Sequence, residues 1–447
     1  MLRRIAPFVL LLFFTTLACS LLEGPPQLVL PTPIPTAPPF SVEASAETVF
    51  DPVSDVVPAV DPEVAFLVNS VSQQQLFGYV QTLQNFQTRH SYSDANHPAL
   101  GIGAARLWIY NEFIRVGNGR LQVQFDTFPM HYDTLAYEQQ NIVATLPGTS
   151  GHPGVIILTA HYDSRTLNIN DGGSFAPGAN DNASGVAVLL EVARLLSSRT
   201  WNQTVVFVAF AGEEQDTAGS RHFVSNKMLE GWIIDAALNN DIVGGRPGIP
   251  QLIRVFAPGP DTSPLRQFTR YMDLVGSLYL PQFPMEVVDA RDREGRYSDH
   301  LRFLDAGVVA VRLTESQEDI SRNHTAADTW DAIDYNYLRQ AAQLNLATVA
   351  NAVGAPPPPP SPVVAPMADP GAYILTWTPH PLADGYVISF RPVGSEEFAP
   401  FYFVNALQAG NVAITGLAPQ TAYALSLAAL DESGRIGLFS PEVIVGP

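Results

Sequence analysis

Short apolar runs alternate along much of the chain with segments whose apolar residues recur at helical spacing. Residues 155–159 (V-I-I-L-T) and 204–210 (T-V-V-F-V-A-F) are continuous apolar runs, typical of strands buried on both faces. Between them, the apolar positions of residues 186–196 fall on one face of a helix. This strand–helix–strand order predicts an α/β fold with a doubly wound, mostly parallel sheet and helices on both faces.

The same alternation extends over residues 63–354, which we interpret as one domain. It predicts further helices near residues 73–86 and 104–115, and further strands near residues 236–238, 252–256 and 308–313.

A different pattern follows five consecutive prolines at 356–360, which predict a semi-rigid linker at 355–362. Turn-separated strands are expected near residues 373–377, 385–390, 412–415 and 423–429. They predict a small β-sandwich over residues 363–447. Its segments L-T-W and I-T-G-L-A-P-Q-T-A-Y resemble fibronectin type III domains. We expect this domain to act as a spacer rather than to bind a surface polymer or protein.

The N-terminus has the pattern of an export signal. Two arginines precede an apolar run at 5–17 that is too short to span a bilayer comfortably, and Leu-Ala-Cys follows. This ending resembles a bacterial lipobox, so residues 1–19 predict a lipoprotein-type signal peptide with a lipid on Cys19. An ordinary signal peptide with an incidental cysteine is the alternative. Proline-rich residues 20–62 predict a tether, and the protein is expected on the outer face of the cell membrane or envelope.

Composition limits the possible classes of function. Of the 447 residues, 46% are hydrophobic and 15% are charged, which is enough apolar material for a large core. The formal net charge is -19 and no basic stripe exists, which argues against nucleic acid as a partner. Cys19 is the only cysteine, so no intrachain disulfide can form.

Seven residues with metal-binding or acid–base side chains follow the predicted strands: His161, Asp163, Asp181, Glu213, Glu214, Asp241 and His324. Each alone has a structural explanation, such as a turn or a helix N-cap for Asp181. Ligands of open α/β sheets bind outside the carboxyl ends of the strands, so we expect the seven to converge in one crevice. Two histidines and several carboxylates suit a pair of divalent metal ions, with one carboxylate left over as a general base.

The segments around these residues resemble those of a known family. They are T-A-H-Y-D-S, G-A-N-D-N-A-S-G, F-A-G-E-E, N-N-D, Y-S-D-H and N-H-T-A-A-D-T. Over residues 64–353, approximately, the chain is similar to the secreted bacterial zinc aminopeptidases with a two-metal site. That family also includes glutamate carboxypeptidases, glutaminyl cyclases and transferrin-receptor ectodomains.

The resemblance implies a metal-binding role for five residues. Asp181 would bridge two zinc ions through its two carboxylate oxygens. His161 and Asp241 would complete one zinc site, and Glu214 and His324 would complete the other. Two Zn²⁺ per chain are therefore the expected cofactor, although cobalt or manganese would suit the same donors.

The resemblance also assigns the acid–base chemistry. Glu213 would be the general base that takes a proton from a metal-activated water and returns it to the leaving amine. Asp163 would orient His161 by accepting its second N–H.

Other residues of the matching segments are expected to support the site. Residues 298–300 are expected to support the wall of the site without binding metal, and Tyr297 is a candidate to stabilise the oxyanion. Asp328 would either orient His324 or cap a helix.

The leading hypothesis is an exported zinc aminopeptidase that hydrolyses N-terminal residues from peptides. Carboxypeptidase and glutaminyl cyclase are alternatives from the same family, and a non-catalytic surface binding protein is a third. The complete set of five ligands argues against the cyclase branch, in which one zinc site is lost. In the loop at 290–297, expected to line the pocket, Arg291, Arg293 and Arg296 either bind acidic substrates or are solvated.

Overall fold

The computed structural model describes residues 58–132, 135–398 and 401–447. The predicted signal peptide at 1–19, with Cys19, and nearly all of the tether predicted at 20–62 lie outside the described residues. Within the described ranges, no helix combines the length and the apolarity that a membrane span requires.

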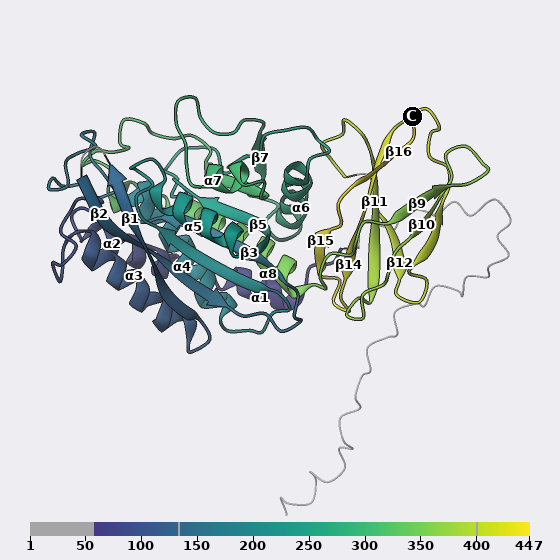
Figure 1. Ribbon diagram of the computed structural model, residues 1–447, viewed down its shortest axis with the longest axis horizontal. Coiled ribbons are helices and arrows are strands. Elements are labelled where there is room, and N and C mark those ends of the chain that lie inside the picture. The colour runs from purple at the N-terminus through teal and green to yellow at the C-terminus, as the bar shows by residue number, and fades with distance from the viewer. Residues whose placement is uncertain (1–57, 133–134, 399–400) are drawn as a thin grey trace, which may run out of the picture. The chain divides into compact units, whose positions relative to one another are not determined.

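A mixed sheet forms the centre of the α/β domain, with the order β1-β2-β4-β3-β5-β8-β6-β7 (Figure 1). Its strands are β1 (Gln122–Tyr132), β2 (Leu135–Leu146), β3 (Gly154–His161), β4 (Thr204–Phe210), β5 (Ile233–Asn240), β6 (Ile253–Phe256), β7 (Met285–Val288) and β8 (Ala310–Glu315). The central strands β4, β3, β5 and β8 are parallel. The pairs β1–β2, β2–β4 and β6–β8 are antiparallel and the edge pair β6–β7 is parallel, so the sheet is mixed and the predicted parallel arrangement holds for its centre.

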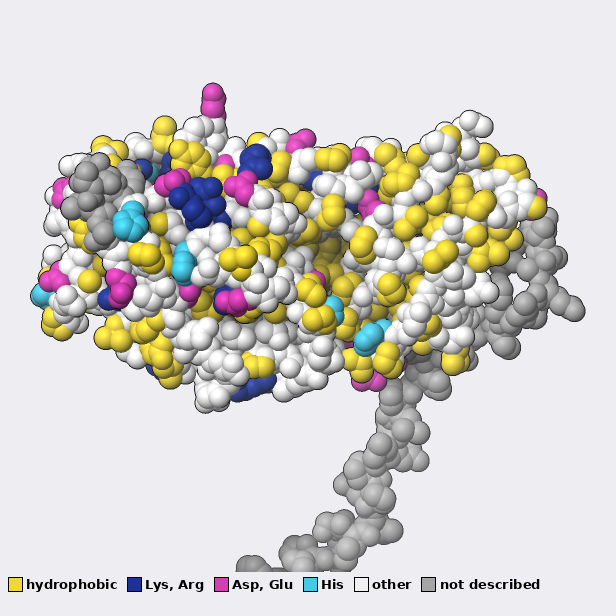
Figure 2. Space-filling view, viewed as in Figure 1, with side chains coloured by type: hydrophobic (Ala, Val, Ile, Leu, Met, Phe, Trp, Pro, Cys, Tyr) yellow, Lys and Arg dark blue, Asp and Glu magenta, His cyan; other side chains and the backbone are white. Residues whose placement is uncertain are grey.

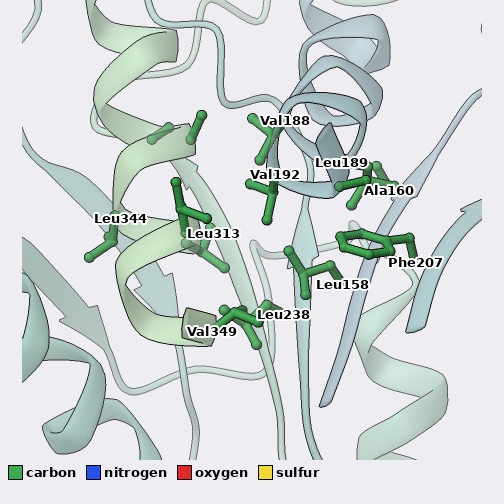
Figure 3. Packing of buried hydrophobic residues seen from close by; sticks show 14 of the residues in the cluster. Leu158, Ala160, Val188, Leu189, Val192, Phe207, Leu238, Leu313, Leu344 and Val349 are labelled. Atoms are coloured by element: carbon green, nitrogen blue, oxygen red, sulfur yellow. The ribbon is translucent and has the colours of Figure 1, made fainter. Parts of the chain in front are cut away.

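Helices cover both faces of this sheet, as predicted. They are α1 (Pro62–Asn69), α2 (Gln73–Gln84), α3 (Gly101–Gly117), α4 (Ser184–Leu196), α5 (Ala218–Leu229), α6 (Pro264–Tyr279), α7 (His300–Asp305) and α8 (Tyr335–Gly354). On one face, Val192 of α4 and Leu158 of β3 belong to a large apolar cluster that also includes α8 (Figure 3). On the other face, Phe223 of α5 and Phe303 of α7 pack against Phe210 of β4.

The packed structure begins before α1, inside the range expected for the tether. Asp61 is buried and caps α1 by accepting the backbone N–H of Val64 at 2.8 Å. Its own N–H donates to the hydroxyl of Tyr279, and its carboxylate pairs with Arg435 at 2.9 Å. The last residues of the expected tether are therefore fixed to the folded body.

The C-terminal domain is a β-sandwich, as predicted. Its strands are β9 (Val363–Pro366), β10 (Tyr373–Thr376), β11 (Gly385–Pro392), β12 (Tyr402–Asn405), β13 (Asn411–Ile414), β14 (Tyr423–Leu430), β15 (Ile436–Phe439) and β16 (Val443–Val445). They form one sheet of order β13-β10-β9 and another of order β12-β11-β14-β15, with β16 beside β14. Leu375 of β10 and Leu427 of β14 share the apolar core between the sheets. The fibronectin type III assignment stays a prediction.

The sandwich and the α/β domain share one continuous apolar cluster, which includes Phe439 of β15 and residues of α6 and α8. The hydroxyl of Tyr271 in α6 donates to the carbonyl of Ile436 at 3.0 Å. Most of the proline run at 356–360 is buried. The run that predicts a semi-rigid linker therefore packs against the folded body over most of its length.

Candidate metal centre

The structure brings all of the predicted site residues together at the carboxyl ends of the parallel strands. They are His161 at the end of β3, Glu213 and Glu214 after β4, Asp241 after β5, His324 after β8, and Asp163 and Asp181 between β3 and α4. Because β4, β3, β5 and β8 are neighbours in the sheet, residues distant in sequence reach the same crevice.

The carboxylate of Asp181 lies between the two histidines. Its Oδ1 is 3.3 Å from Nε2 of His161, and its Oδ2 is 3.2 Å from Nε2 of His324. A second carboxylate faces each of these nitrogens. Asp241 Oδ1 is 3.5 Å from His161 Nε2, and Glu214 Oε1 is 3.2 Å from His324 Nε2. The cluster therefore has two halves that share Asp181.

Two buried oxygens of this cluster, Asp241 Oδ1 and Glu214 Oε1, accept no hydrogen bond from any described residue. A buried polar atom without a partner is costly, and each of these atoms points toward a histidine nitrogen. Imidazole and carboxylate are donors that divalent transition metals prefer. One ion in each half fits these residues. A carboxylate oxygen of Glu213 also lies within 4.8 Å of the donor atoms of His161 and Asp241.

Asp163 fixes the loop that carries the two glutamates. Its carboxylate oxygens accept the backbone N–H groups of Glu213 and Glu214, each at 3.1 Å. His161 Nδ1 is 3.2 Å from the backbone carbonyl of Asp163 and 3.5 Å from its Oδ1, so the carbonyl is the nearer acceptor. Asp163 thus ties the β3 end of the site to the β4 end.

Asp328 holds the backbone at Asp181. Its two oxygens accept the N–H groups of Asn180, at 2.8 Å, and of Asp181, at 2.9 Å. Asn180 and Asp181 lie in the first turn of a short helix that leads into α4, so Asp328 caps a helix, which is one of its two predicted roles. Among the described residues, no hydrogen bond or ion pair joins Asp328 to His324, so the other predicted role is not seen. This first turn, η1 (Ala179–Ala183), has non-helical backbone at Asp181, and its N–H groups need acceptors from elsewhere.

A buried arginine, Arg89, connects the end of β3 to the segment that directly precedes η1. The Arg89 guanidinium donates to the carbonyl oxygens of Tyr162 at 2.7 Å, Pro177 at 2.7 Å and Gly178 at 2.8 Å. Burial lowers the pKa of Arg89 to about 10, so the side chain stays charged at neutral pH. Arg89 therefore holds the residue that follows β3 close to the two residues that precede η1, the turn that carries Asp181.

A second buried arginine, Arg312 of β8, lies against a candidate metal ligand. Its side chain is 0% exposed, and its Nη2 lies 3.0 Å from Asp241 Oδ2. Its Nη1 lies 2.6 Å from Oδ1 of Asp292. Arg312 therefore occupies one oxygen of Asp241 and leaves the other, Oδ1, facing His161.

The cluster opens into a cleft of about 320 Å³. Besides the ligand candidates, its wall contains Arg165, Ile169, Asp216, Arg293, Gly295, Arg296 and Tyr297. The loop at 290–297, which is expected to line the pocket, contributes four residues to this wall. Tyr297 is 56% exposed, whereas Ser298 behind it is buried and accepts a hydrogen bond from Asn239 at 2.7 Å.

The comparisons with known proteins identify the family. The model of Peptidase family M28 matches residues 141–349, a range that contains every metal-ligand candidate. A protein of Pyricularia oryzae named "Probable zinc metalloprotease" is 33% identical over 352 residues, which cover 68% of this chain and 70% of that protein. The chain belongs to peptidase family M28. Membership in M28 assigns it to the metallopeptidases, which hydrolyse peptide bonds.

Solved structures show the same fold as the M28 domain described here. The LapA aminopeptidase of Legionella pneumophila superposes with a TM-score of 0.53 at 21% identity, covering 68% of this chain and 77% of that one. A glutaminyl cyclase of Porphyromonas gingivalis superposes with a TM-score of 0.50 at 21% identity, covering 62% and 98% respectively. At these identities the likeness concerns the fold alone.

The M28 site holds several carboxylates close together and buried, and both burial and the neighbouring charges shift pKa values there. Burial, together with the neighbouring Glu214 and Asp241, raises the pKa of Glu213 well above its ordinary value. Burial opposes the charged form of His324, but Glu214 and Asp181 outweigh it and raise the pKa of His324 to about 9. Without metal, the imidazolium of His324 therefore offsets part of the negative charge.

We expect the metal-free protein to lose stability as pH rises from about 6.5 to 9. His324 has a raised pKa in the folded state, so its contribution is complete below the unfolded pKa of about 6.5 and is lost as pH rises through about 9. Divalent metal should reverse this trend, because metal binds the deprotonated imidazole. Thermal melting of chelated and metal-loaded protein across this pH range measures both effects.

The matched variants for this test are His324→Gln and His131→Gln. His131 is exposed on β1 and lies outside the cluster. His324→Gln should flatten the decline of the metal-free protein, and His131→Gln should leave it unchanged. A decline of equal size in both variants would assign the pH dependence to other groups.

Proposed function

We propose that this M28 peptidase is a zinc-dependent aminopeptidase that hydrolyses N-terminal residues from peptides and holds two Zn²⁺ per chain. The observation that carries the proposal is the position of Asp181, with one carboxylate oxygen facing each histidine. A shared carboxylate can hold two ions about 3.5–4 Å apart, the spacing of two-metal hydrolases. The names of the fungal relative and of LapA supply zinc and the class of substrate.

The assignment of ligands follows from the two halves of the cluster. His161 and Asp241 would hold one ion, Glu214 and His324 the other, and Asp181 both. When bound there, zinc would polarise the scissile carbonyl and make a water easier to deprotonate.

The proton transfers fall to Glu213. Within the described residues its carboxylate accepts no hydrogen bond, and it lines the cleft beside the metal-ligand candidates. Glu213 takes a proton from the attacking water while the water oxygen bonds to the carbonyl carbon. As the C–N bond breaks, Glu213 gives that proton to the leaving amine. Asp163 holds the Glu213 backbone throughout, so the base needs no reorganisation. Tyr297, at the mouth, is the candidate hydrogen-bond donor to the oxyanion.

The alternatives differ in what they require of this site. A glutaminyl cyclase or a carboxypeptidase would use the same fold, and a surface binding protein would need no catalytic base. The complete ligand set, with the free carboxylate of Glu213 beside it, favours hydrolysis over pure binding.

The test is a panel of aminoacyl-p-nitroanilides and peptides with free or acetylated N-termini, assayed together with metal content. We expect about two zinc ions per chain and cleavage of free N-termini only. Attack on acetylated peptides from the C-terminus would indicate a carboxypeptidase. A folded protein that binds zinc but cleaves nothing would contradict the proposal.

We propose in addition that the protein is exported and anchored by a lipid on Cys19. The apolar run followed by Leu-Ala-Cys supports this proposal. Membrane fractionation of cells that produce Cys19→Ser tests it, because an unchanged membrane association of the variant would contradict lipid anchoring.

A further inference from the structure

Three arginines line the cleft, and they differ in their partners. Arg165 donates to Glu214 Oε2 at 2.6 Å, so its charge is paired with a candidate metal ligand. Arg293 pairs with Glu318 and, at 3.2 Å, with Asp292. Arg296, by contrast, has no side-chain hydrogen bond or ion pair with any described residue, and it is only partly exposed.

The charge balance makes this unpaired arginine unusual. Asp181, Glu213, Glu214 and Asp241 carry four negative charges, which two divalent ions would neutralise. The Asp216 carboxylate, also in the wall, is paired with other arginines. The loaded cleft then keeps the positive charges of Arg165, which still holds Glu214, and of Arg296, which has no carboxylate partner among the described residues. The protein has a formal net charge of -19, and on the face drawn in Figure 2 the few basic side chains lie among acidic ones, so a generally basic surface does not explain a positive charge in the cleft.

The loop that carries Arg296 is fixed at its base. Asp292 is nearly buried and pairs with the fully buried Arg312, and Arg293 pairs with Glu318. The backbone N–H of Arg296 donates to the carbonyl of Arg293, which closes a turn with Gly295 at a φ of +68°. A guanidinium on such an anchored turn is positioned before the substrate arrives, which lowers the entropic cost of binding.

We propose that Arg296 binds a carboxylate of the substrate. The guanidinium fork matches a carboxylate with two parallel hydrogen bonds, and burial of the pair by the substrate strengthens it. The carboxylate comes either from an acidic side chain or from the free C-terminus of a short peptide. Ile169 and Tyr297, in the same wall, offer apolar contact to the remainder of the substrate. This inference rests on the proposed peptidase function and names its preferred substrates.

Two pairs of probes separate the sources of the carboxylate. Glutamyl- against glutaminyl-p-nitroanilide tests an acidic side chain, and Leu-Gly against Leu-Gly-amide tests a free C-terminus. The wild type should favour the charged member of one pair. Arg296→Gln should reduce kcat/KM for that member roughly tenfold to hundredfold, mainly through KM, and should leave its neutral partner unchanged.

The matched control is Arg291→Gln. Arg291 is exposed on the same loop, pairs with Asp305 and does not line the cleft. Arg291→Gln should leave unchanged the ratio of kcat/KM for the charged probe to kcat/KM for the neutral probe in both pairs. Loss of preference in both variants would assign the effect to the general charge of the loop and overturn the proposal, as would a wild type with no preference for either charged probe.

Calorimetric binding of the same probes to zinc-loaded Glu213→Gln protein, with and without Arg296→Gln, separates this inference from the proposed function. If the wild type cleaves nothing but probe binding depends on Arg296, the carboxylate-binding role of Arg296 is supported and the proposed peptidase function is contradicted. If the wild type cleaves the probes but their binding does not depend on Arg296, the peptidase function is supported and the role of Arg296 is contradicted.

Discussion

Glu213→Gln should lower kcat by roughly 10²–10⁴-fold while the protein keeps its metal ions and its fold. Glutamine preserves the size of the side chain but cannot take a proton from water. Glu213 is not needed to complete either half of the metal cluster, so the metal content should stay at the wild-type value. Single-turnover kinetics together with metal analysis of the purified variant measure both quantities.

The control for this experiment is Glu138→Gln, because Glu138 is exposed on β2 and away from the cleft. It should behave as wild type. If Glu213→Gln lost zinc together with activity, Glu213 would be a ligand and not the base. If it kept full activity, another group would carry the proton.

Arg312→Met should destabilise the metal-free protein by about 3–5 kcal/mol. The substitution keeps the volume of the side chain but leaves Asp241 and Asp292 buried without their shared cation. A metal ion beside Asp241 would supply part of the missing positive charge, so the loss should be smaller in the zinc-loaded protein. Denaturant unfolding of both forms gives the two values.

Arg339→Met provides the comparison, since Arg339 of α8 is partly exposed and, among the described residues, its side chain forms a hydrogen bond only with Asn336. Its effect should stay within about 0.5 kcal/mol. An equal loss for Arg312→Met in the metal-free and loaded forms would mean that Arg312 supports the fold without influencing the metal ligand.

The metal-ligand candidates could be found from the sequence because each follows a strand that is easy to predict. β3 and β4 are short, nearly continuous apolar runs, and the carboxyl ends of the parallel strands β3, β4, β5 and β8 must meet at one edge of the sheet. Histidine and carboxylate in those positions leave few other interpretations. The convergence of His161, Asp181 and His324 follows from this topology.

The supporting residues could not be found in this way. Arg89 and Arg312 are buried cations whose partners lie up to 89 residues away in sequence, and no spacing rule connects them. The contact of Asp328 with the backbone of Asp181 depends on an irregular turn, and main-chain donors have no sequence signature. Arg296 could be named as a candidate, but only the structure separates it from its paired neighbour Arg293.

In the fold, the edges and the junction were the parts that sequence patterns did not predict. β1 alternates exposed polar positions such as Gln122 and Gln124 with partly buried Val123 and Phe125, the pattern of a half-exposed antiparallel strand. β1 has no continuous apolar run of the kind that identifies the buried central strands. The composition of the proline run predicts a semi-rigid linker but does not show whether the run packs against the domains, because buried and exposed prolines have the same composition.

The shared core of the two domains limits how this protein can be recombined with others. A chain cut at the prolines would uncover the apolar sides of α6 and α8 and remove Ile436, the acceptor of the Tyr271 hydroxyl. Asp261 would also lose Arg391, its fully buried partner at 2.6 Å. A peptidase grafted onto a different carrier must therefore keep β15. Replacing the sandwich by another domain would therefore require compensating changes in the apolar sides of α6 and α8.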